Sequence, residues 1–234
     1  ENKQIVFTKK NTAELLDAVY REPQENEVVV RTAFSTISCG TEKANITGDP
    51  NVSGDGPSAT IFPRKLGYSS SGTVVEKGVN VKSVNIGDRV VVYWGTHSLY
   101  NTVNENNVVK INDDITFQEA AVSFIATFPL NAIRKTNFEI GESSIVMGLG
   151  VLGQLAVKLL RAAGASQIIG VDPVKSRRDE GILSGADYVF DPYDTDFVNK
   201  AKKVTDGGTN VAIEVTGVGA GFDKVLDCMA KFGR

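Results

Sequence analysis

The sequence is poor in residues that bind metal ions. Among its 234 residues there are two cysteines, Cys39 and Cys228, and one histidine, His97. The cysteines form no CxxC pair, and with a single histidine they are too few for a four-ligand Cys/His zinc site. We therefore expect no structural zinc. So few cysteines fit a reducing compartment, and we expect a cytoplasmic protein.

Long apolar runs and excess positive charge are also absent. No apolar run approaches the roughly 18 to 20 residues of a transmembrane helix. The formal net charge is −3, so no basic footprint suggests a nucleic acid or an anionic membrane as a partner. Glycine and proline together make up 30 residues, too few for a low-complexity chain. A globular protein with a small-molecule substrate is the expectation that remains.

The pattern of apolar residues changes midway along the chain. The first half has short β-branched runs separated by Gly, Pro, Asn and Asp, which predict a small, curved sheet or barrel. Thr116 and Glu119 are spaced as in a capping box, and a helical stretch is expected from there to about Lys135. The second half alternates strands and helices, which predicts a parallel sheet. Its expected strands are 143–147, 167–171, 187–190 and 210–215, and its expected helices are 152–163, 175–183, 195–204 and 221–231.

A glycine-rich run lies between the first strand and the first helix of this second half. It reads Gly148-Leu149-Gly150-Val151-Leu152-Gly153, which is a GxGxxG pattern. In a strand–turn–helix context the first glycine makes the tight turn, the second lets a pyrophosphate approach, and the third lets helix and strand pack closely. The helix N-terminus would then direct free N–H groups at the phosphates. The sequence therefore predicts a dinucleotide-binding loop.

Asp172 ends the next expected strand, at the spacing where a carboxylate accepts hydrogen bonds from the adenosine ribose. A carboxylate at this place also repels a 2′-phosphate, so NAD(H) is favoured over NADP(H). Arg177 weakens that preference, because an arginine nearby can hold a 2′-phosphate. The alternative is an ordinary turn followed by a helix-capping Asp.

The sequence combines a β-rich first half, the run Gly87-Asp88-Arg89-Val90 and the GxGxxG unit. In these three features it resembles the medium-chain dehydrogenase/reductase superfamily and its zinc-type alcohol dehydrogenases. The resemblance implies an α/β protein with a GroES-like catalytic domain at 1–125 and a Rossmann domain, with a doubly wound parallel sheet, at 126–234. A complete Rossmann sheet has six strands and only four are expected here, so we interpret the C-terminal portion as missing.

The sequence departs from the zinc-type pattern at the positions that would bind the catalytic zinc. The resemblance implies zinc ligands at Cys39, at the second residue of Gly67-Tyr68-Ser69 and near Ser123, and only Cys39 is of a ligand type. We therefore expect no catalytic zinc, with Cys39 as a buried small hydrophobe. The run Cys39-Gly40-Thr41-Glu42 and the lone His97 resemble the branch of bacteriochlorophyllide dehydrogenase-like and bi-domain oxidoreductases.

Without zinc, hydrogen bonds and a proton relay must polarise the substrate. Thr41 falls where zinc-type relatives place a relay hydroxyl, although a loop threonine is the alternative. Glu42 is a second candidate, with a solvated loop glutamate as the simpler interpretation. His97 is the only side chain whose ordinary pKa lies near neutrality, and it is either an acid/base group or structural. Tyr68 is either a hydroxyl donor or a half-buried strand tyrosine.

The resemblance also implies coenzyme contacts from Thr127, Thr216 and Gly217. We expect an oxidoreductase that transfers a hydride between NAD(H) and a secondary alcohol or ketone, as a homodimer in its full-length form. Two alternatives remain open. One is a zinc-free NADPH-dependent enone or quinone reductase, and the other is a dinucleotide-binding sensor without catalysis.

Overall fold

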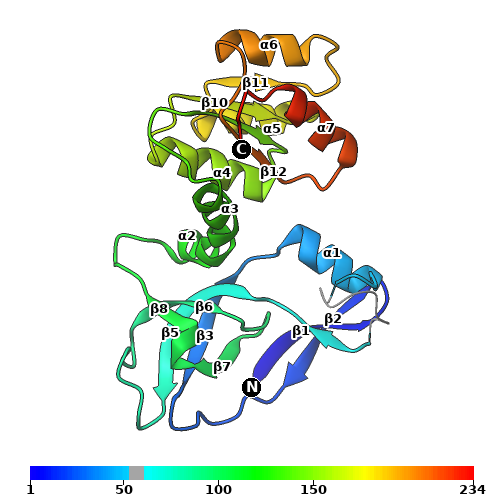
Figure 1. Ribbon diagram of the computed structural model, residues 1–234. Helices are drawn as coiled ribbons and strands as arrows, with labels where there is room; N and C mark the ends of the chain where they lie inside the picture. Colours follow the sequence, from blue (N-terminus) through cyan, green and yellow to red (C-terminus); the bar gives the residue numbers. More distant parts are fainter. Residues whose placement is uncertain (53–60) are drawn as a thin grey trace. The chain divides into compact units, whose positions relative to one another are not determined.

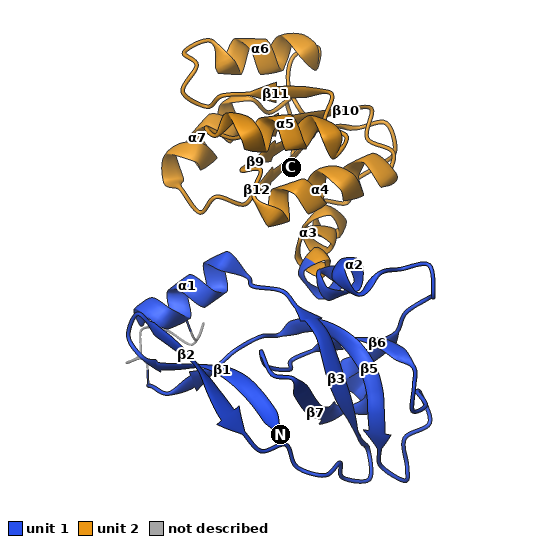
Figure 2. Ribbon diagram, turned by 180° about the vertical axis from the view of Figure 1, so that it is seen from behind, with its two compact units in different colours: residues 1–125 blue, residues 126–234 orange. Residues whose placement is uncertain are grey.

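The computed structural model describes residues 1–52 and 61–234, which form two compact units, Glu1–Ile125 and Ala126–Arg234. Figure 2 shows the two units in different colours. None of the helices in these residues is long and apolar enough to cross a membrane.

Unit 1 consists mainly of antiparallel strands in two sheets (Figure 1). The smaller sheet has the order β2-β1-β4 and the larger one the order β7-β3-β5-β6-β8. The strands are β1 (Asn2–Lys9), β2 (Thr12–Ala18), β3 (Glu27–Ser35), β4 (Arg64–Lys65), β5 (Ser69–Lys77), β6 (Arg89–Tyr93), β7 (Tyr100–Asn104) and β8 (Val108–Lys110). A helix, α1 (Cys39–Thr47), follows β3, and a 3-10 turn, η1 (Glu105–Asn107), follows β7.

The core of unit 1 is made almost entirely of valine. Side chains from β3, β5, β6, β7 and β8 meet in one cluster, to which the loop between β5 and β6 adds two more. β-Branched side chains are stiff at χ1 and pack well on a pleated surface, which is why these runs form strands. The cluster consists of Val28, Val30, Val74, Val81, Val84, Val90, Val92, Val103 and Val108.

The helical stretch predicted after Thr116 is present in two pieces, α2 (Phe117–Ala121) and α3 (Ser123–Lys135), with Val122 between them. The predicted capping box is confirmed, because the Thr116 hydroxyl accepts from the Glu119 amide and the Glu119 carboxylate accepts from the Thr116 amide.

Unit 2 is a parallel sheet of order β11-β10-β9-β12, the predicted doubly wound arrangement. The four expected strands are all present, with ends that differ by at most one residue. They are β9 (Ser143–Met147), β10 (Gln167–Val171), β11 (Tyr188–Phe190) and β12 (Val211–Glu214). The helices between and after them are α4 (Val151–Ala162), α5 (Lys175–Leu183), α6 (Phe197–Val204) and α7 (Gly219–Asp227).

Alternate residues of β9 enter two separate cores. Val146 packs with Leu149 and with residues of α3 and α4, whereas Ile145 and Met147 pack with residues of α6 and α7. Burial on both faces explains why these strands are continuous apolar runs. Cys228 was expected in the core and lies there, at 0% exposed. Burial raises the pKa of its thiol to about 11.

The last helix is shorter than predicted. It was expected over 221–231 but ends at Asp227. Beyond it the chain pairs with Thr209, whose amide donates to the Cys228 carbonyl at 2.9 Å and whose carbonyl accepts from the Ala230 amide at 2.9 Å. These contacts come from residues about 20 positions earlier, so the local apolar period could not reveal them.

Candidate functional site

The glycine loop of unit 2 has the backbone geometry that the sequence predicted. Gly148 follows β9 with φ of +96°, a left-handed conformation that favours glycine. A Cβ on Gly153 would lie 1.8 Å from the Gly148 carbonyl oxygen, so only glycine allows the helix to start this close to the turn. Gly150 precedes α4 without a side-chain cap, and a Cβ there would meet no atom of the described residues within 4 Å. The loop therefore offers uncapped N–H groups at a point that a ligand can approach.

Asp172 anchors this loop to the end of β10. It is 2% exposed, and its two carboxylate oxygens accept from the Leu149 amide at 2.9 Å and from the Val174 amide at 2.8 Å. Nη1 of Arg177 lies 3.6 Å from the carboxylate. Each carboxylate oxygen can accept a second hydrogen bond, so this anchoring role leaves capacity for a ligand hydroxyl.

A cavity of about 380 Å³ lies beside the loop, within the size range of small-molecule sites. Five of the predicted coenzyme contacts line it, namely Gly148, Gly150, Asp172, Arg177 and Thr216. The other lining residues were not predicted from the sequence, and they include Pro173, Pro192, Tyr193 and Lys224. The Lys224 ammonium donates to the Pro192 carbonyl and lies 5.7 Å from the centre of the Tyr193 ring. The position of Tyr193 after β11 is the only sequence signal that could have identified it as a lining residue of this cavity.

The remaining predicted contacts are placed differently. The Leu149 side chain is 1% exposed in the core, and Val151 and Leu152 belong to the first turn of α4. The Gly217 amide donates to the Glu214 carboxylate at 3.2 Å, next to the amide of the cavity-lining Thr216, which donates to the same carboxylate at 2.7 Å. Thr127 lies on α3.

In unit 1 the structure brings His97 and Glu42 together. Nε2 of His97 lies 3.1 Å from Oε1 of Glu42, and Nδ1 of His97 lies 2.8 Å from the hydroxyl of Ser35. The exposed fractions of His97 and Glu42 are 8% and 7%. The other carboxylate oxygen of Glu42 is buried without a hydrogen-bond partner among the described residues. A hydrogen-bonded chain therefore runs from Ser35 through His97 to Glu42, where it ends inside the unit.

The position of His97 is fixed by its backbone and by a glycine. Its amide donates to the Leu66 carbonyl at 2.6 Å, and its carbonyl accepts from the Ile5 amide at 2.9 Å. Gly67 has φ of +119°, and a Cβ there would lie 2.8 Å from Cγ of the imidazole. The absence of that Cβ lets the ring pack directly on the backbone, which holds it toward Ser35 and Glu42.

Two alternative interpretations and one expectation for the residues around Glu42 are wrong. Glu42 is not a solvated loop residue, because it is buried on α1. Thr41 is not in a loop, because α1 begins at Cys39, and the Thr41 hydroxyl lies 3.2 Å from that of Ser38. Cys39 is exposed rather than buried, because it begins the helix at the surface. No helix was predicted here, since α1 has a mixed polar composition without an apolar stripe.

Tyr68 belongs to an aromatic group. It immediately precedes β5, and its ring centre is 6.1 Å from that of Trp94 and 5.7 Å from that of Phe124. Trp94 is 65% exposed and has a left-handed backbone with φ of +61°. The Trp94 amide donates to the Tyr68 carbonyl at 3.0 Å. This hydrogen bond links the segment that contains Tyr68 to the segment that contains Trp94 and His97.

The residues at the zinc-ligand positions do not fit a zinc ion. Tyr68 and Ser123 offer hydroxyls, which are poor neutral-pH ligands, and Ser123 is exposed at the start of α3. His97 has both ring nitrogens in hydrogen-bond contact with Ser35 and Glu42. Within the described ranges, no three His, Cys, Asp or Glu side chains lie close enough together to hold a metal.

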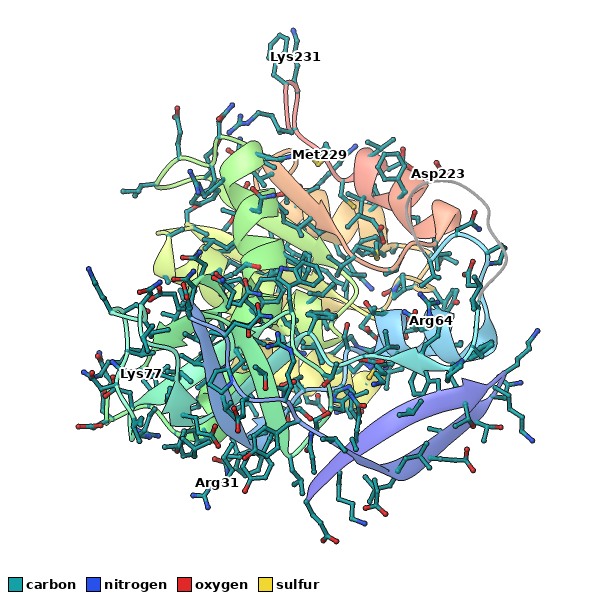
Figure 3. The ribbon with its side chains drawn as sticks, turned by 90° about the horizontal axis from the view of Figure 1, so that it is seen from below. Arg31, Arg64, Lys77, Asp223, Met229 and Lys231 are labelled. Atoms are coloured by element: carbon teal, nitrogen blue, oxygen red, sulfur yellow. The ribbon has the colours of Figure 1, made fainter. Side chains whose placement is uncertain are left out.

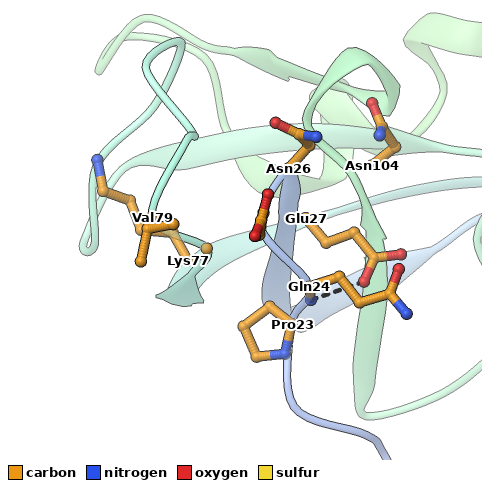
Figure 4. A pocket seen from close by; sticks show the side chains of 9 residues that line it. Pro23, Gln24, Asn26, Glu27, Lys77, Val79 and Asn104 are labelled. Carbon is orange, nitrogen blue, oxygen red and sulfur yellow. Dashed lines mark hydrogen bonds between the residues drawn. The ribbon is translucent and has the colours of Figure 1, made fainter.

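A larger hollow of about 660 Å³ in unit 1 has the wrong chemistry for a site (Figure 4). Of its charged side chains, Glu27 accepts from the Gln24 amide at 2.9 Å and pairs with Arg21, whose hydrogen bond holds the pKa of Glu27 below its usual value. The ammonium of Lys77, labelled also in Figure 3, donates to the carbonyls of Val81 and Val84. These two charges are already used by the fold, and the third charged lining residue, Glu25, accepts from the side-chain amide of Asn80 at 3.2 Å.

Comparison with known proteins places the chain in a family. Residues 24–116 match the alcohol dehydrogenase GroES-like domain, and residues 151–234 match the zinc-binding dehydrogenase domain. D-guloside 3-dehydrogenase of Escherichia coli is 30% identical over 99% of this chain and 71% of its own length. (R,R)-Butanediol dehydrogenase of Bacillus subtilis is 32% identical over 67% of this chain and 53% of its own length. The chain belongs to the zinc-type alcohol dehydrogenase-like superfamily, a family of oxidoreductases.

Solved structures show the same fold. A zinc-binding dehydrogenase from Clostridium scindens has a TM-score of 0.89 at 21% identity, over 99% of this chain and 75% of that one. One from Sinorhizobium meliloti, solved with NADP, has a TM-score of 0.85 at 21% identity over the same shares. The predicted GroES-like and Rossmann folds are confirmed.

Proposed function

We propose that the protein transfers a hydride between NAD(H) and a secondary alcohol or ketone, without a catalytic zinc ion. The observation that carries this proposal is the loop Gly148–Gly153, which joins β9 to an uncapped helix N-terminus beside the buried Asp172. The named relatives support the reaction type, because guloside and butanediol dehydrogenases act on alcohols.

The residues of unit 2 fit a dinucleotide. The N–H groups at the start of α4 would bind the pyrophosphate, and Asp172 would accept from the adenosine ribose hydroxyls. The bound nicotinamide supplies the redox chemistry. The protein binds and orients it, and Thr127, Thr216 and Gly217 are the proposed contacts nearer the ring.

The proposed preference for NAD(H) rests on the charge of Asp172. A carboxylate that lines the cavity disfavours a 2′-phosphate, and Arg177 at 3.6 Å partly offsets this effect. Arg177 is also the observation that favours the second candidate function, a zinc-free NADPH-dependent enone or quinone reductase. Coenzyme selectivity therefore separates the two candidates.

Catalysis without zinc is supported by Tyr68 and Ser123, which occupy two of the three zinc-ligand positions and are poor zinc ligands. In place of a Lewis acid, proton transfer through His97 and Glu42 would accompany the hydride transfer. Tyr68 remains a proposed hydroxyl donor to the substrate oxygen, and Thr41 a proposed second relay hydroxyl.

Two measurements on the protein purified without added metal test this function. Zinc per chain, by elemental mass spectrometry, should be near zero, and NADH should bind more tightly than NADPH. Oxidation of a panel of secondary alcohols and polyols should then proceed without zinc. A zinc content near one per chain would contradict the metal-free proposal. Tighter binding of NADPH would favour the reductase, and tight NADH binding without turnover would favour a sensor.

A further inference from the structure

We propose that Ser35 is the residue that exchanges a proton with the substrate oxygen, and that His97 and Glu42 act behind it. This inference rests on the proposed function and assigns a residue that neither the sequence pattern nor the family positions single out. Ser35 is half-buried at the end of β3, whereas His97 and Glu42 are more than nine-tenths buried.

Burial and hydrogen bonding determine the order of the three groups. His97 has no free ring nitrogen for a substrate, because Nδ1 lies 2.8 Å from the Ser35 hydroxyl and Nε2 lies 3.1 Å from Glu42. An ionised Glu42 can only accept, so Nε2 carries the proton and Nδ1 is the acceptor that faces Ser35. The Ser35 hydroxyl donates to Nδ1, and its oxygen keeps two lone pairs, one of which can accept the proton of a substrate hydroxyl.

The proton balance of alcohol oxidation follows from this order. The carbinol C–H bond breaks, and its hydride goes to the oxidised nicotinamide, which is reduced. The alcohol O–H proton passes to Ser35 Oγ while the proton of Ser35 passes to Nδ1 of His97. The products are the ketone, the reduced coenzyme and an imidazolium beside Glu42, and ketone reduction runs the same steps backwards.

Glu42 is the positioning residue of this chain. Its Oε1 holds the imidazole in the tautomer that leaves Nδ1 bare, and its charge stabilises the imidazolium that forms. Oε2 of Glu42, which has no hydrogen-bond partner among the described residues, adds to this effect, because a buried carboxylate with one unsatisfied oxygen gains most from a positive charge next to it. The roles resemble those of a Ser-His-acid triad, with the two imidazole nitrogens exchanged.

The order of the hydrogen bonds can be tested without turnover, because His97 is the only histidine of the chain. In the full chain with ring-¹⁵N-histidine, NMR shows one pair of ring nitrogens, each identified by its couplings to the ring protons. At a pH where the imidazole is neutral, we expect Nε2 to be protonated and Nδ1 to be bare. Ser35→Ala should move the Nδ1 resonance and leave Nε2 protonated. A protonated Nδ1 in the wild type would overturn the proposal, because Ser35 could not then pass its proton to His97.

Kinetics provide the second test. Ser35→Ala should lower kcat for alcohol oxidation by about 100-fold or more, a usual size for loss of general acid–base catalysis, with KM and the Kd of NADH little changed. Ser35→Thr should restore kcat to within about tenfold of the wild type, because it keeps the hydroxyl. Ser71→Ala is the matched control, since it removes a strand hydroxyl that donates to the Phe117 carbonyl at 2.6 Å. It should leave kcat unchanged.

The two tests separate this inference from the function on which it rests. Unchanged kcat in Ser35→Ala would overturn the relay even in an active dehydrogenase. A wild type that oxidises no alcohol but has the expected tautomer would contradict the proposed function and support the hydrogen-bond order of the relay.

Discussion

The two units hold their functional groups in different ways. In unit 2 the site is made mostly of backbone: glycines, amides at a helix start and one carboxylate that two amides hold. In unit 1 it is made of side chains from three segments, Ser35 on β3, Glu42 on α1 and His97 after β6.

In the proposed function, this difference separates coenzyme recognition in unit 2 from proton transfer in unit 1. A backbone site needs particular φ values and close approaches, which are fixed by residues near one another in sequence. A proton relay needs titratable side chains at hydrogen-bond distance, and His97 is 55 positions from Glu42 and 62 from Ser35. Substitutions in unit 1 should therefore change turnover, and substitutions in unit 2 should change coenzyme binding.

The largest effect is expected at His97. His97→Asn removes the proton acceptor and should lower kcat by about 10²- to 10⁴-fold. The Kd of NADH should stay the same, because the dinucleotide contacts proposed above lie in unit 2. Steady-state kinetics and NADH fluorescence titration measure the two quantities. Surviving turnover would mean that the proton leaves through Thr41 and Glu42 instead.

The converse test is made at the glycine loop. In Gly153→Ala the new Cβ would lie 1.8 Å from the Gly148 carbonyl, so the turn must move. We expect NADH affinity to fall by about 100-fold or more, equivalent to about 3 kcal/mol. Calorimetric titration measures the affinity, and circular dichroism shows whether the fold survives.

Gly150→Ala is the matched control for that substitution. A Cβ at Gly150 meets nothing within 4 Å among the described residues and its φ is −74°, so the fold should tolerate alanine. NADH affinity should still fall, by about tenfold, if the pyrophosphate passes over this residue. Full affinity in Gly150→Ala would contradict the placement of the phosphates.

A smaller effect is expected at Asp172, which holds the loop and, in the proposed function, also selects the coenzyme. Asp172→Ala leaves the amides of Leu149 and Val174 without their acceptors, which should cost about 1 to 3 kcal/mol in free energy of unfolding. The preference for NADH over NADPH should fall by about tenfold, equivalent to about 1.4 kcal/mol. Measurements of the Kd of NADH and of NADPH check the coenzyme preference, and urea unfolding checks the loss of stability.

Asp172→Asn separates the two roles of this side chain. It removes the charge and keeps an oxygen acceptor, so coenzyme selectivity should fall while less stability is lost. Selectivity that is unchanged in both variants would count against Asp172 as the ribose ligand.

Local patterns explain how much of the structure could be predicted from the sequence. The strands of unit 2 were predicted nearly to the residue, because burial on both faces requires continuous apolar runs. The charged helix 175–183 was also predicted with its observed bounds. The glycine loop and Asp172 were found for a related reason, since their spacing is set within one strand–helix–strand unit. Glu42 was a catalytic candidate beside the interpretation as a solvated loop residue, and Ser35 was not considered. Their burial and contacts depend on the pairing of distant segments.

The smallest effect concerns a carboxylate of unit 1 that supports the fold rather than the site. In the capping box, hydrogen bonds from the Thr116 hydroxyl and amide hold the pKa of Glu119 below its usual value of 4.5. A carboxyl group with a lowered pKa in the folded state stabilises the fold above its unfolded-state pKa. That contribution is lost as the pH falls through the folded-state pKa. Stability should therefore decrease from about pH 5 downward, where the unfolded-state glutamate begins to bind protons.

Glu119→Gln isolates this contribution, because glutamine also completes a capping box but does not titrate. Urea unfolding at pH 7 and pH 4 should show a smaller loss of stability in the variant than in the wild type. Equal losses would mean that other carboxylates of unit 1, such as Asp88 and Glu105, determine its acid sensitivity, since their pKa values are also lowered by hydrogen bonds. Glu119→Gln should leave kcat at pH 7 unchanged, because among the described residues the Glu119 carboxylate accepts hydrogen bonds from Thr116 alone, in the cap that begins α2.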